Sequence, residues 1–374
     1  MTIRRLTLEH VGPIERADVT FGDLTVLVGP QATGKSIFLQ FLKLLVDAPR
    51  ILGILQNHGI DWNRRLGDFL DVYLGEGMRG VWRDESSLRR DGRPVDLQKL
   101  VGTKRSSGTS AMFFIPAQRV LTLSRGWPRP FSDYSPGDPF VVRAFSETIR
   151  QLLERGLVNE IFPSPRLEDE VRRLLQENVF AAFGLQVDTS GLQKRLVLSG
   201  GGHQLPFMVW SAGQREFVPL LLGFHLLQSP TVRVHLPWVV IEEIEMGLHP
   251  RAISAVLLLV LELLSEGYRI CLSTHSTHVL DVVWALRVFQ ERGASPDRLL
   301  ELFDVAKTRK ARAMASKVLE KKAKVYFFER GHTKDISNLD PGSDDAAESG
   351  WGGLSAFSGR VADIVARVVN ETGG

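Results

Sequence analysis

The chain has 374 residues, 44% of them apolar, and a formal net charge of +3. That apolar fraction is enough to bury one large core or two modest ones, so the composition excludes a disordered chain. Cys271 is the only cysteine, which excludes an internal disulfide framework and favours a reducing compartment. The sequence has no signal-peptide pattern at its start, and its most apolar run, residues 255–264, is interrupted by Glu262 and is too short to span a bilayer. We therefore expect a cytoplasmic protein with no membrane partner.

The first predicted elements are short strands followed by a helix. Residues 2–28 alternate apolar and polar side chains and end in LTVLVG, a nearly continuous apolar run that is typical of a strand buried on both faces. Residues 37–46 predict an apolar helix. From residue 47 to residue 110 the pattern becomes irregular, with glycine, arginine and tryptophan scattered among short helical pieces, and we expect an insertion there.

The middle of the chain predicts a core strand, a loop and a helical region. AMFFIPAQR, residues 111–119, is a strand pattern that stops at Pro116, and the turn-rich residues 126–139 predict a surface loop. Two helices are expected around residues 139–155 and 166–183, without a sustained heptad. Strand-like segments follow at residues 185–199 and 203–208.

The last third alternates helices with buried strands. Helices are predicted at residues 213–227 and 250–266, and strands in PWVVIEE and YRICLSTH. This alternation predicts an α/β fold with a parallel core sheet. Residues 307–324 hold eight basic side chains against Glu320 alone; such a run could bind an acidic partner, but it is also typical of a solvated helix face or a loop. The chain is expected to end in a strand, an acidic turn and a closing helix at residues 359–369.

A phosphate-binding loop is predicted directly after the third strand. GPQATGKS, residues 29–36, satisfies G-x-x-x-x-G-K-[ST] between a strand and a helix, which is the context that the pattern requires. Its glycines allow backbone N–H groups to curl around phosphate oxygens, and the helix start adds partial positive charge. Lys35 would reach the β- and γ-phosphates, and the Ser36 hydroxyl would ligate Mg²⁺. The predicted nucleotide-binding residues here are Gly29, Pro30, Gln31, Ala32, Thr33, Gly34, Lys35, Ser36 and Ile37.

Two adjacent carboxylates form the second motif. In VVIEEIEMGLHP an apolar run brings Glu242 and Glu243 to the end of a strand, and α/β sheets bind ligands at that edge. One carboxylate can hold Mg²⁺ and the next can polarise an attacking water. Two glutamates alone would more often be surface charge, but their position after a buried strand, in a chain with a phosphate loop, favours the functional interpretation.

Two further motifs contribute a serine and a histidine. SAGQRE, which begins at Ser211, opens a helix with a hydroxyl and free N–H groups suited to a γ-phosphate, although an ordinary N-cap is the alternative. In LSTHS, His275 follows the last core strand and could bond the γ-phosphate or the lytic water. His275 and His278 have metal-ligand spacing, but no cysteine or acidic cluster completes a zinc site.

The order of these motifs resembles that of the ATP-binding-cassette (ABC) ATPases, and among them the heads of the SMC, RecF and OLD-like class. The resemblance covers about residues 1–46 and 196–280, and it implies an α/β P-loop NTPase fold with a mixed N-terminal sheet, a parallel core sheet and a helical insertion or lid. The parts expected within one head, residues 1–374, are the N-terminal sheet and Walker A loop (1–46), the insertion (47–110), the Q-loop strand with a surface loop and helical lid (111–200), the lobe of the signature, Walker B and switch histidine (201–300), and the basic segment with the closing elements (301–374).

The resemblance also implies roles for individual residues. Lys35, Glu243 and His275 would be catalytic, as the Walker A lysine, the catalytic glutamate and the switch histidine. Mg²⁺ would be held by Ser36, by Glu242 as the Walker B acid, and by Gln118 as the Q-loop glutamine, which would also contact the nucleotide. Glu242 departs from the aspartate that is usual there. The signature residues, which would act in trans on ATP held by a second copy in a homodimer, are Ser211, Ala212, Gly213 and Gln214.

The function implied is ATP binding and hydrolysis by a head dimer that drives or gates a DNA-related partner, in DNA repair or prokaryotic anti-phage defence. An effector encoded nearby, such as a nuclease, would be a partner, and the basic residues 79–105 and 307–324 predict sequence-independent DNA binding. The alternatives are a nucleotide-binding subunit of an ABC transporter and an OLD-like nuclease component. EIEMGLHP resembles stand-alone prokaryotic ATPases more than transporter subunits. FFERGHTKD faintly resembles the opening of a Toprim domain, but residues 336–374 are too few to complete one.

Overall fold

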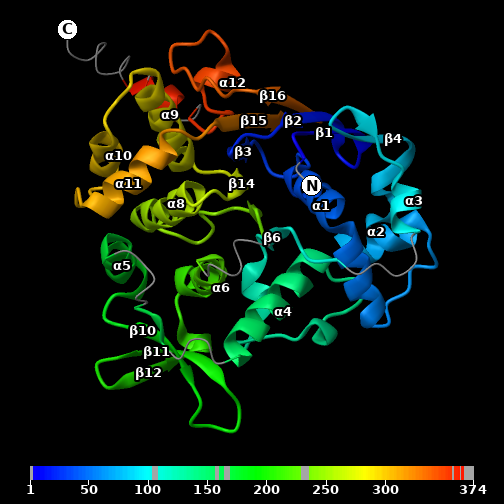
Figure 1. Ribbon diagram of the computed structural model, residues 1–374, viewed down its shortest axis with the longest axis horizontal. Helices are drawn as coiled ribbons and strands as arrows, with labels where there is room; N and C mark the ends of the chain where they lie inside the picture. The colour runs from blue at the N-terminus through cyan, green and yellow to red at the C-terminus, as the bar shows by residue number, and fades with distance from the viewer. Residues whose placement is uncertain are drawn as a thin grey trace.

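The fold is organised around one large mixed sheet. The structure is a computed structural model, and it describes residues 3–102, 108–155, 160–163, 169–228, 236–355, 358–362 and 364–365. Ten strands run in the order β5-β4-β1-β2-β16-β15-β3-β14-β13-β6. Figure 1 shows α8, α9 and α11 on one side of this sheet and α1, α2 and α3 on the other. The fold is therefore α/β, as predicted.

The strands of the large sheet fall into a parallel core and a mixed N-terminal part. From β15 through β3, β14 and β13 to β6, every neighbouring pair is parallel. The pairs β1·β2, β1·β4 and β15·β16 are antiparallel. All five residues of β3 are buried, as expected for a strand covered on both faces. The strands are β1 Arg5–Val11, β2 Ile14–Thr20, β3 Leu24–Val28, β4 Trp82–Arg90, β5 Arg93–Pro94, β6 Met112–Ile115, β13 Trp238–Ile241, β14 Arg269–Thr274, β15 Ala323–Glu329 and β16 His332–Asp335.

The helices cover both faces of the sheet and give the chain two buried clusters. One cluster lies under α6 and α8, the other under α1 and α2. The helices are α1 Lys35–Asn57, α2 Leu66–Leu74, α3 Leu97–Val101, α4 Phe140–Glu154, α5 Asp169–Leu175, α6 Ala212–Leu227, α8 Pro250–Ser265, α9 Thr277–Glu291, α10 Pro296–Leu302, α11 Arg309–Val318 and α12 Ala346–Ser349. Within the described segments, no helix combines the length and the apolar character needed to cross a bilayer.

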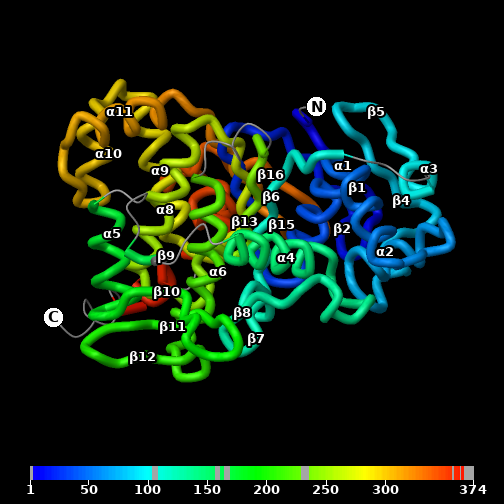
Figure 2. The backbone as a smooth tube through the Cα atoms, turned by 60° about the horizontal axis from the view of Figure 1, so that its bottom comes forward, coloured from blue at the N-terminus to red at the C-terminus, as the bar shows by residue number. Residues whose placement is uncertain are grey.

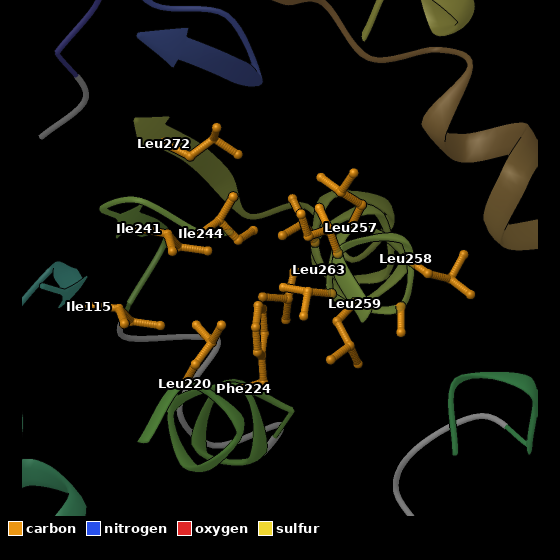
Figure 3. Close-up of a cluster of buried hydrophobic side chains, with 14 of the residues drawn as sticks. Ile115, Leu220, Phe224, Ile241, Ile244, Leu257, Leu258, Leu259, Leu263 and Leu272 are labelled. Atoms are coloured by element: carbon orange, nitrogen blue, oxygen red, sulfur yellow. The ribbon is translucent and has the colours of Figure 1, made fainter. Parts of the chain in front are cut away.

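The packing of α6 and α8 fixes the carboxyl edge of the core strands. Figure 3 shows Leu220 and Phe224 of α6 and Leu263 of α8 gathered near Ile115 and Ile241, which close β6 and β13. Burying each such side chain contributes about 1.5 to 3 kcal/mol. The strand ends that carry the predicted motifs are therefore held in a rigid frame.

The predicted insertion contains more regular structure than its sequence indicates. Helix α1 does not end at Val46 but continues to Asn57, past Asp47 (φ −123°) and Pro49. Residues 82–94 form β4 and β5, which extend the large sheet. The short helical pieces expected here are present as the end of α1, α2 and α3, whereas the strands at residues 82–94 were not expected. The division of the chain into five parts stays a prediction.

A buried ion pair explains how α1 tolerates this interruption. Lys43 donates to the Asp47 carboxylate, and both side chains are buried. The same carboxylate accepts the Ala111 N–H at 2.7 Å and the Ser110 hydroxyl. These bonds anchor α1 to the start of β6.

The predicted surface loop is partly a core element. Within residues 126–139, Phe131 and Tyr134 are buried, and the Phe131 ring stacks on His58 at 4.3 Å between centroids. The loop belongs to a hairpin of β7 (Leu123–Ser124) and β8 (Trp127–Pro128). Its turn chemistry was visible in the sequence, whereas its aromatic anchors were not recognised.

A second, four-stranded antiparallel sheet lies beside α5 and α6 (Figure 2). Its strands are β9 Glu160–Phe162, β10 Gly184–Asp188, β11 Arg195–Gly200 and β12 His203–Pro206. The helix predicted at 166–183 is α5 followed by a π-helical turn, Gln176–Phe180. Of the predicted closing helix, residues 359–362 and 364–365 are helical, and the rest lies outside the described residues.

Candidate nucleotide site

The predicted phosphate loop joins β3 to α1, and its glycines are required sterically. Gly29 has φ 142°, and a Cβ there would lie 2.2 Å from the Phe328 carbonyl oxygen. Gly34 has φ 94°, and its Cβ would lie 2.5 Å from Cγ1 of Ile14. Glycine alone fits both positions without strain. The loop therefore keeps the tight turn that aims successive N–H groups at one point.

The ammonium group of Lys35 is hydrogen-bonded to main-chain carbonyls of this loop. Its Nζ donates to the Gly29 carbonyl at 2.7 Å and to the Pro30 carbonyl at 2.6 Å. Burial lowers the pKa of Lys35 to about 8, and the charges of Glu243 and Glu245 oppose that effect. The ammonium group therefore stays largely charged at neutral pH, and phosphate oxygens could replace its two carbonyl partners.

Glu242 is buried directly beyond β13. Its side chain is 2% exposed, and burial raises its pKa to about 6, although the Ser36 hydroxyl and the Ala117 N–H act in the opposite direction. Oε2 accepts the Ala117 N–H at 3.2 Å. Oε1 is buried without a hydrogen-bond partner within the described residues. A buried, unsatisfied carboxylate oxygen near a serine hydroxyl suits a Mg²⁺ ion, which prefers oxygen ligands.

Glu243 and His275 lie together at the same edge. Glu243 has φ 44°, which is unusual for a residue other than glycine. Its N–H donates to Ser273 Oγ at 3.2 Å, and its Oε1 lies 3.8 Å from His275 Nε2. Burial and the charge of Lys35 lower the pKa of His275, against the effect of Glu243 and Glu245. His275 is therefore a neutral hydrogen-bonding group at pH 7.

Glu245 is a further residue of this site, and it was not predicted from the sequence. Its carboxylate accepts the Thr274 hydroxyl at 2.9 Å and the His275 N–H, so it fixes the loop that presents His275. The only sequence signal is a third glutamate in EEIE. Arg119, the residue after Gln118, was also missed: its side chain is buried and donates to the carbonyls of Glu242 and Glu243.

Gln118 is less closely tied to the site. It follows β6 and precedes a 3₁₀ turn, Arg119–Thr122, with its side chain exposed. Its neighbour Ala117 donates to Glu242, so the loop lies on the side of the site where a metal would bind. Contact of Gln118 with nucleotide or Mg²⁺ stays a prediction.

The signature residues begin α6 as the sequence predicts. Ser211 and Gln214 form a capping box, in which Gln214 N donates to Ser211 Oγ at 3.2 Å and Ser211 N donates to Gln214 Oε1 at 3.0 Å. Ser211 and Ala212 are exposed. A Cβ on Gly213 would lie 2.8 Å from the Gly247 carbonyl oxygen. Figures 1 and 2 place α6 and α1 on different sides of β6.

The other acidic and histidine groups have separate partners. His278 Nε2 bonds Ser254 Oγ on α8 at 2.9 Å. Asp335 accepts from Lys324 at 3.2 Å, and Asp345 pairs with Lys334. In the part of the chain that the structure describes, no three His, Cys, Asp or Glu side chains cluster as metal ligands. Neither the zinc pair nor a Toprim-like acidic centre is assembled from these residues.

Comparisons with known proteins give a family match over part of the chain. A family model described as "AAA domain, putative AbiEii toxin, Type IV TA system" matches residues 131–281. No curated protein matches the sequence.

Solved structures of SMC heads and of RecF align over most of the length. An SMC head bound to the C-winged helix domain of ScpA is 13% identical and covers 90% of this chain and 97% of its own, with a TM-score of 0.43. The recombination mediator RecF is 8% identical over 89% of this chain and 98% of its own, with a TM-score of 0.39. The SMC head domain from Thermotoga maritima is 13% identical over 90% and 98%, with a TM-score of 0.33. Residue roles are not transferred from proteins this distant, so they depend on the geometry of this chain.

Proposed function

We propose that this chain, a P-loop ATPase head of the ABC and SMC-like class, binds ATP with Mg²⁺ and hydrolyses it at the carboxyl edge of its parallel core strands. One observation carries the proposal. Lys35 follows β3, Glu242 and Glu243 follow β13, and His275 follows β14. Lys35 interacts electrostatically with Glu243 and His275, Glu243 Oε1 lies 3.8 Å from His275 Nε2, and the buried Oε1 of Glu242 is unsatisfied among the described residues. These are the groups that phosphoryl transfer requires.

Each group has a separate task in this mechanism. The N–H groups of the loop and Lys35 bind the β- and γ-phosphates and stabilise charge as the γ-phosphoryl group departs. Ser36 and Glu242 would hold Mg²⁺, which neutralises phosphate charge when bound. Glu243 orients the attacking water and accepts its proton, and neutral His275 hydrogen-bonds the γ-phosphate or that water.

The proposed active unit is a homodimer closed by ATP. Ser211 and Ala212 are exposed, and α6, which they begin, lies on the other side of β6 from α1 (Figures 1 and 2). Just before them, Met208 and Val209 are 69% and 62% exposed, and exposed apolar residues favour a protein interface. The signature end of α6 would thus close on ATP held by the second copy.

The proposed output is control of a DNA-related partner, such as an effector encoded nearby, in repair or anti-phage defence. The matching family is described as a "putative AbiEii toxin, Type IV TA system", and this description favours a role in defence. Arg309 and Lys317 on α11, and Lys322 after it, are exposed cations that could contact phosphates. Others are engaged within the chain, since Arg312 pairs with Asp297 and Arg79 with Asp71. Of the stretch 79–105, residues 103–105 lie outside the described residues.

The substitution Glu243→Gln tests the proposal. We expect ATP turnover to fall by about 100-fold or more, because the general base is lost, and an ATP-dependent dimer to accumulate in mass measurements. Glu291→Gln, at an exposed ion pair on α9, is the control and should behave as wild type. Unchanged turnover in Glu243→Gln without an ATP-stabilised dimer would refute both roles.

A further inference from the structure

Arg119 is a fully buried cation whose hydrogen bonds join three parts of the fold. Its exposed fraction is 0%. Nε donates to the carbonyl of Glu216 on α6 at 3.1 Å. Nη1 donates to the carbonyls of Pro116 after β6, at 3.4 Å, and of Glu242, at 3.0 Å. Nη2 donates to the Glu243 carbonyl at 3.1 Å.

Burying this cation is costly, so its retention requires an explanation. Burial lowers the pKa of Arg119, and the carboxylates of Glu216, Glu245, Glu243 and Glu242 oppose that effect. All four hydrogen-bond acceptors are main-chain carbonyls. A buried charge is weak evidence for stability, because an apolar residue of similar size would often serve equally well. A role at the neighbouring site accounts for it better.

The bonds of Arg119 hold the backbone that aims Glu243. The left-handed conformation of Glu243 costs about 1 kcal/mol or more for a residue with a side chain. It is held at both ends, because its N–H donates to Ser273 Oγ and its carbonyl accepts from Arg119. The conformation sets the direction of the carboxylate toward His275, 3.8 Å away.

The same guanidinium also holds the first turns of α6. Glu216 lies five residues after Ser211, and Gly213 lies so close to the Gly247 carbonyl that a Cβ would be 2.8 Å from it. The start of α6 is therefore linked to the Glu242–Gly247 segment in two ways, through the guanidinium of Arg119 and through the close approach of Gly213 to the Gly247 carbonyl. A displacement of this helix end would be transmitted to the Glu243 turn.

We propose that Arg119 is a positioning residue that couples the placement of the signature end of α6 to the orientation of Glu243. The inference rests on the proposed function, in which ATP of a second copy occupies the start of α6. When that nucleotide fixes Ser211, the Glu216 carbonyl is fixed with it, and the guanidinium holds the carbonyls of Glu242 and Glu243 in the productive arrangement. Each copy thereby aligns its own catalytic carboxylate only when its signature is engaged.

Arg119→Met is the main test, because methionine fills the space but donates no hydrogen bond. We expect the affinity for ATPγS with Mg²⁺ to stay near that of wild type. The kcat for ATP and the trapping of ADP with aluminium fluoride, an analogue of the transferring phosphoryl group, should both fall by about 100-fold, as misplaced catalytic groups do. Arg119→Lys keeps the positive charge but lacks the planar guanidinium that donates to several carbonyls at once. It should therefore recover only part of the wild-type kcat.

The matched control is Arg143→Met. Arg143 is also a buried arginine, but it donates to the Val72 carbonyl at 2.8 Å and lies over the Phe131 ring at 4.8 Å, away from the nucleotide site. Arg143→Met should lower the thermal stability but should not show the fall in kcat at unchanged KM that is expected for Arg119→Met. This control distinguishes positioning from a general cost to folding.

The outcomes separate this inference from the proposed function. Wild-type protein without ATP turnover would overturn both. With an active wild type, Arg119→Met turnover within about 3-fold of it would overturn the coupling alone, since a group misplaced by 1 Å costs far more. If Arg119→Met does not fold, Arg119→Lys decides: lower kcat at unchanged KM supports the coupling, and wild-type kcat and KM overturn it.

Discussion

Replacing Glu242 by glutamine should stabilise the nucleotide-free chain while abolishing its proposed activity. The carboxylate is buried, and its Oε1 has no hydrogen-bond partner among the described residues. Its charge is thus maintained at the expense of folding stability, and a bound cation would offset part of that cost. Glutamine has nearly the same shape and carries no charge.

The magnitude follows from the pKa of Glu242, which burial raises from 4.5 to about 6. A difference of about 1.5 pKa units corresponds to about 2 kcal/mol. Between these two pH values the folded chain keeps a proton that the unfolded chain has lost, so the free energy of unfolding decreases as pH rises through this window. Glu242→Gln avoids this loss. We expect it to be more stable than wild type by about 2 kcal/mol at pH 7.5 and by only a few tenths at pH 4.5.

Thermal unfolding without nucleotide, at both pH values, measures the effect. For a chain of this length, about 2 kcal/mol corresponds to a Tm difference of about 2 to 3 °C. Glu243→Gln, which removes a charge from the neighbouring and partly exposed carboxylate, is the matched control and should change the Tm less than Glu242→Gln does. Adding ATP with Mg²⁺ should raise the Tm of wild type but not of Glu242→Gln. A variant less stable than wild type at pH 7.5, or a Tm difference equal at both pH values, would refute the reasoning.

Two further predictions concern Lys43, Asp47 and Lys35. Asp47→Ala leaves Lys43 buried without its carboxylate and also removes the acceptor for Ala111 N. The free energy of unfolding, measured in urea titrations, should therefore fall by about 3 to 5 kcal/mol. A loss below about 1 kcal/mol would show that the pair contributes little. Because burial lowers the pKa of Lys35 to about 8, wild-type affinity for ATP should weaken as pH rises through that value and the ammonium loses its proton. Nucleotide titrations at pH 7 and pH 9 measure this, and Lys35→Met should bind weakly at both; equal wild-type affinities would contradict the role of Lys35.

The parts of the site that were predictable are those whose chemistry is local in sequence. The phosphate loop is eight consecutive residues between a strand and a helix, so its conformation depends on neighbours along the chain. Glu242 and Glu243 follow the apolar run of β13, and parallel strands bring their carboxyl ends to one edge. The start of α6 was visible because a capping box occupies four consecutive residues.

The parts that escaped prediction depend on contacts between distant residues. The bond of Asp47 to Ala111 spans 64 positions, so this contribution to anchoring the irregular-looking part of α1 is not visible in the local sequence. The bond of Arg119 to Glu243 spans 124 positions, so nothing near IPAQR reveals its role. Strand β4 is rich in charged residues and is recognisable as part of the sheet only through its pairing with β1. Tertiary contacts override local pattern in all three cases.

The cap of α6 has a chemical consequence for any anion that arrives at this helix. Ser211 Oγ accepts a hydrogen bond from the Gln214 N–H. This bond restrains the position of the oxygen, and the hydroxyl proton is still available to donate to another acceptor. A phosphoryl oxygen that binds here would therefore accept from a hydroxyl whose rotamer is already fixed. Binding would then cost little side-chain conformational entropy at Ser211. The bond that caps the start of α6 thus also preorganises Ser211 as a hydrogen-bond donor for a phosphate.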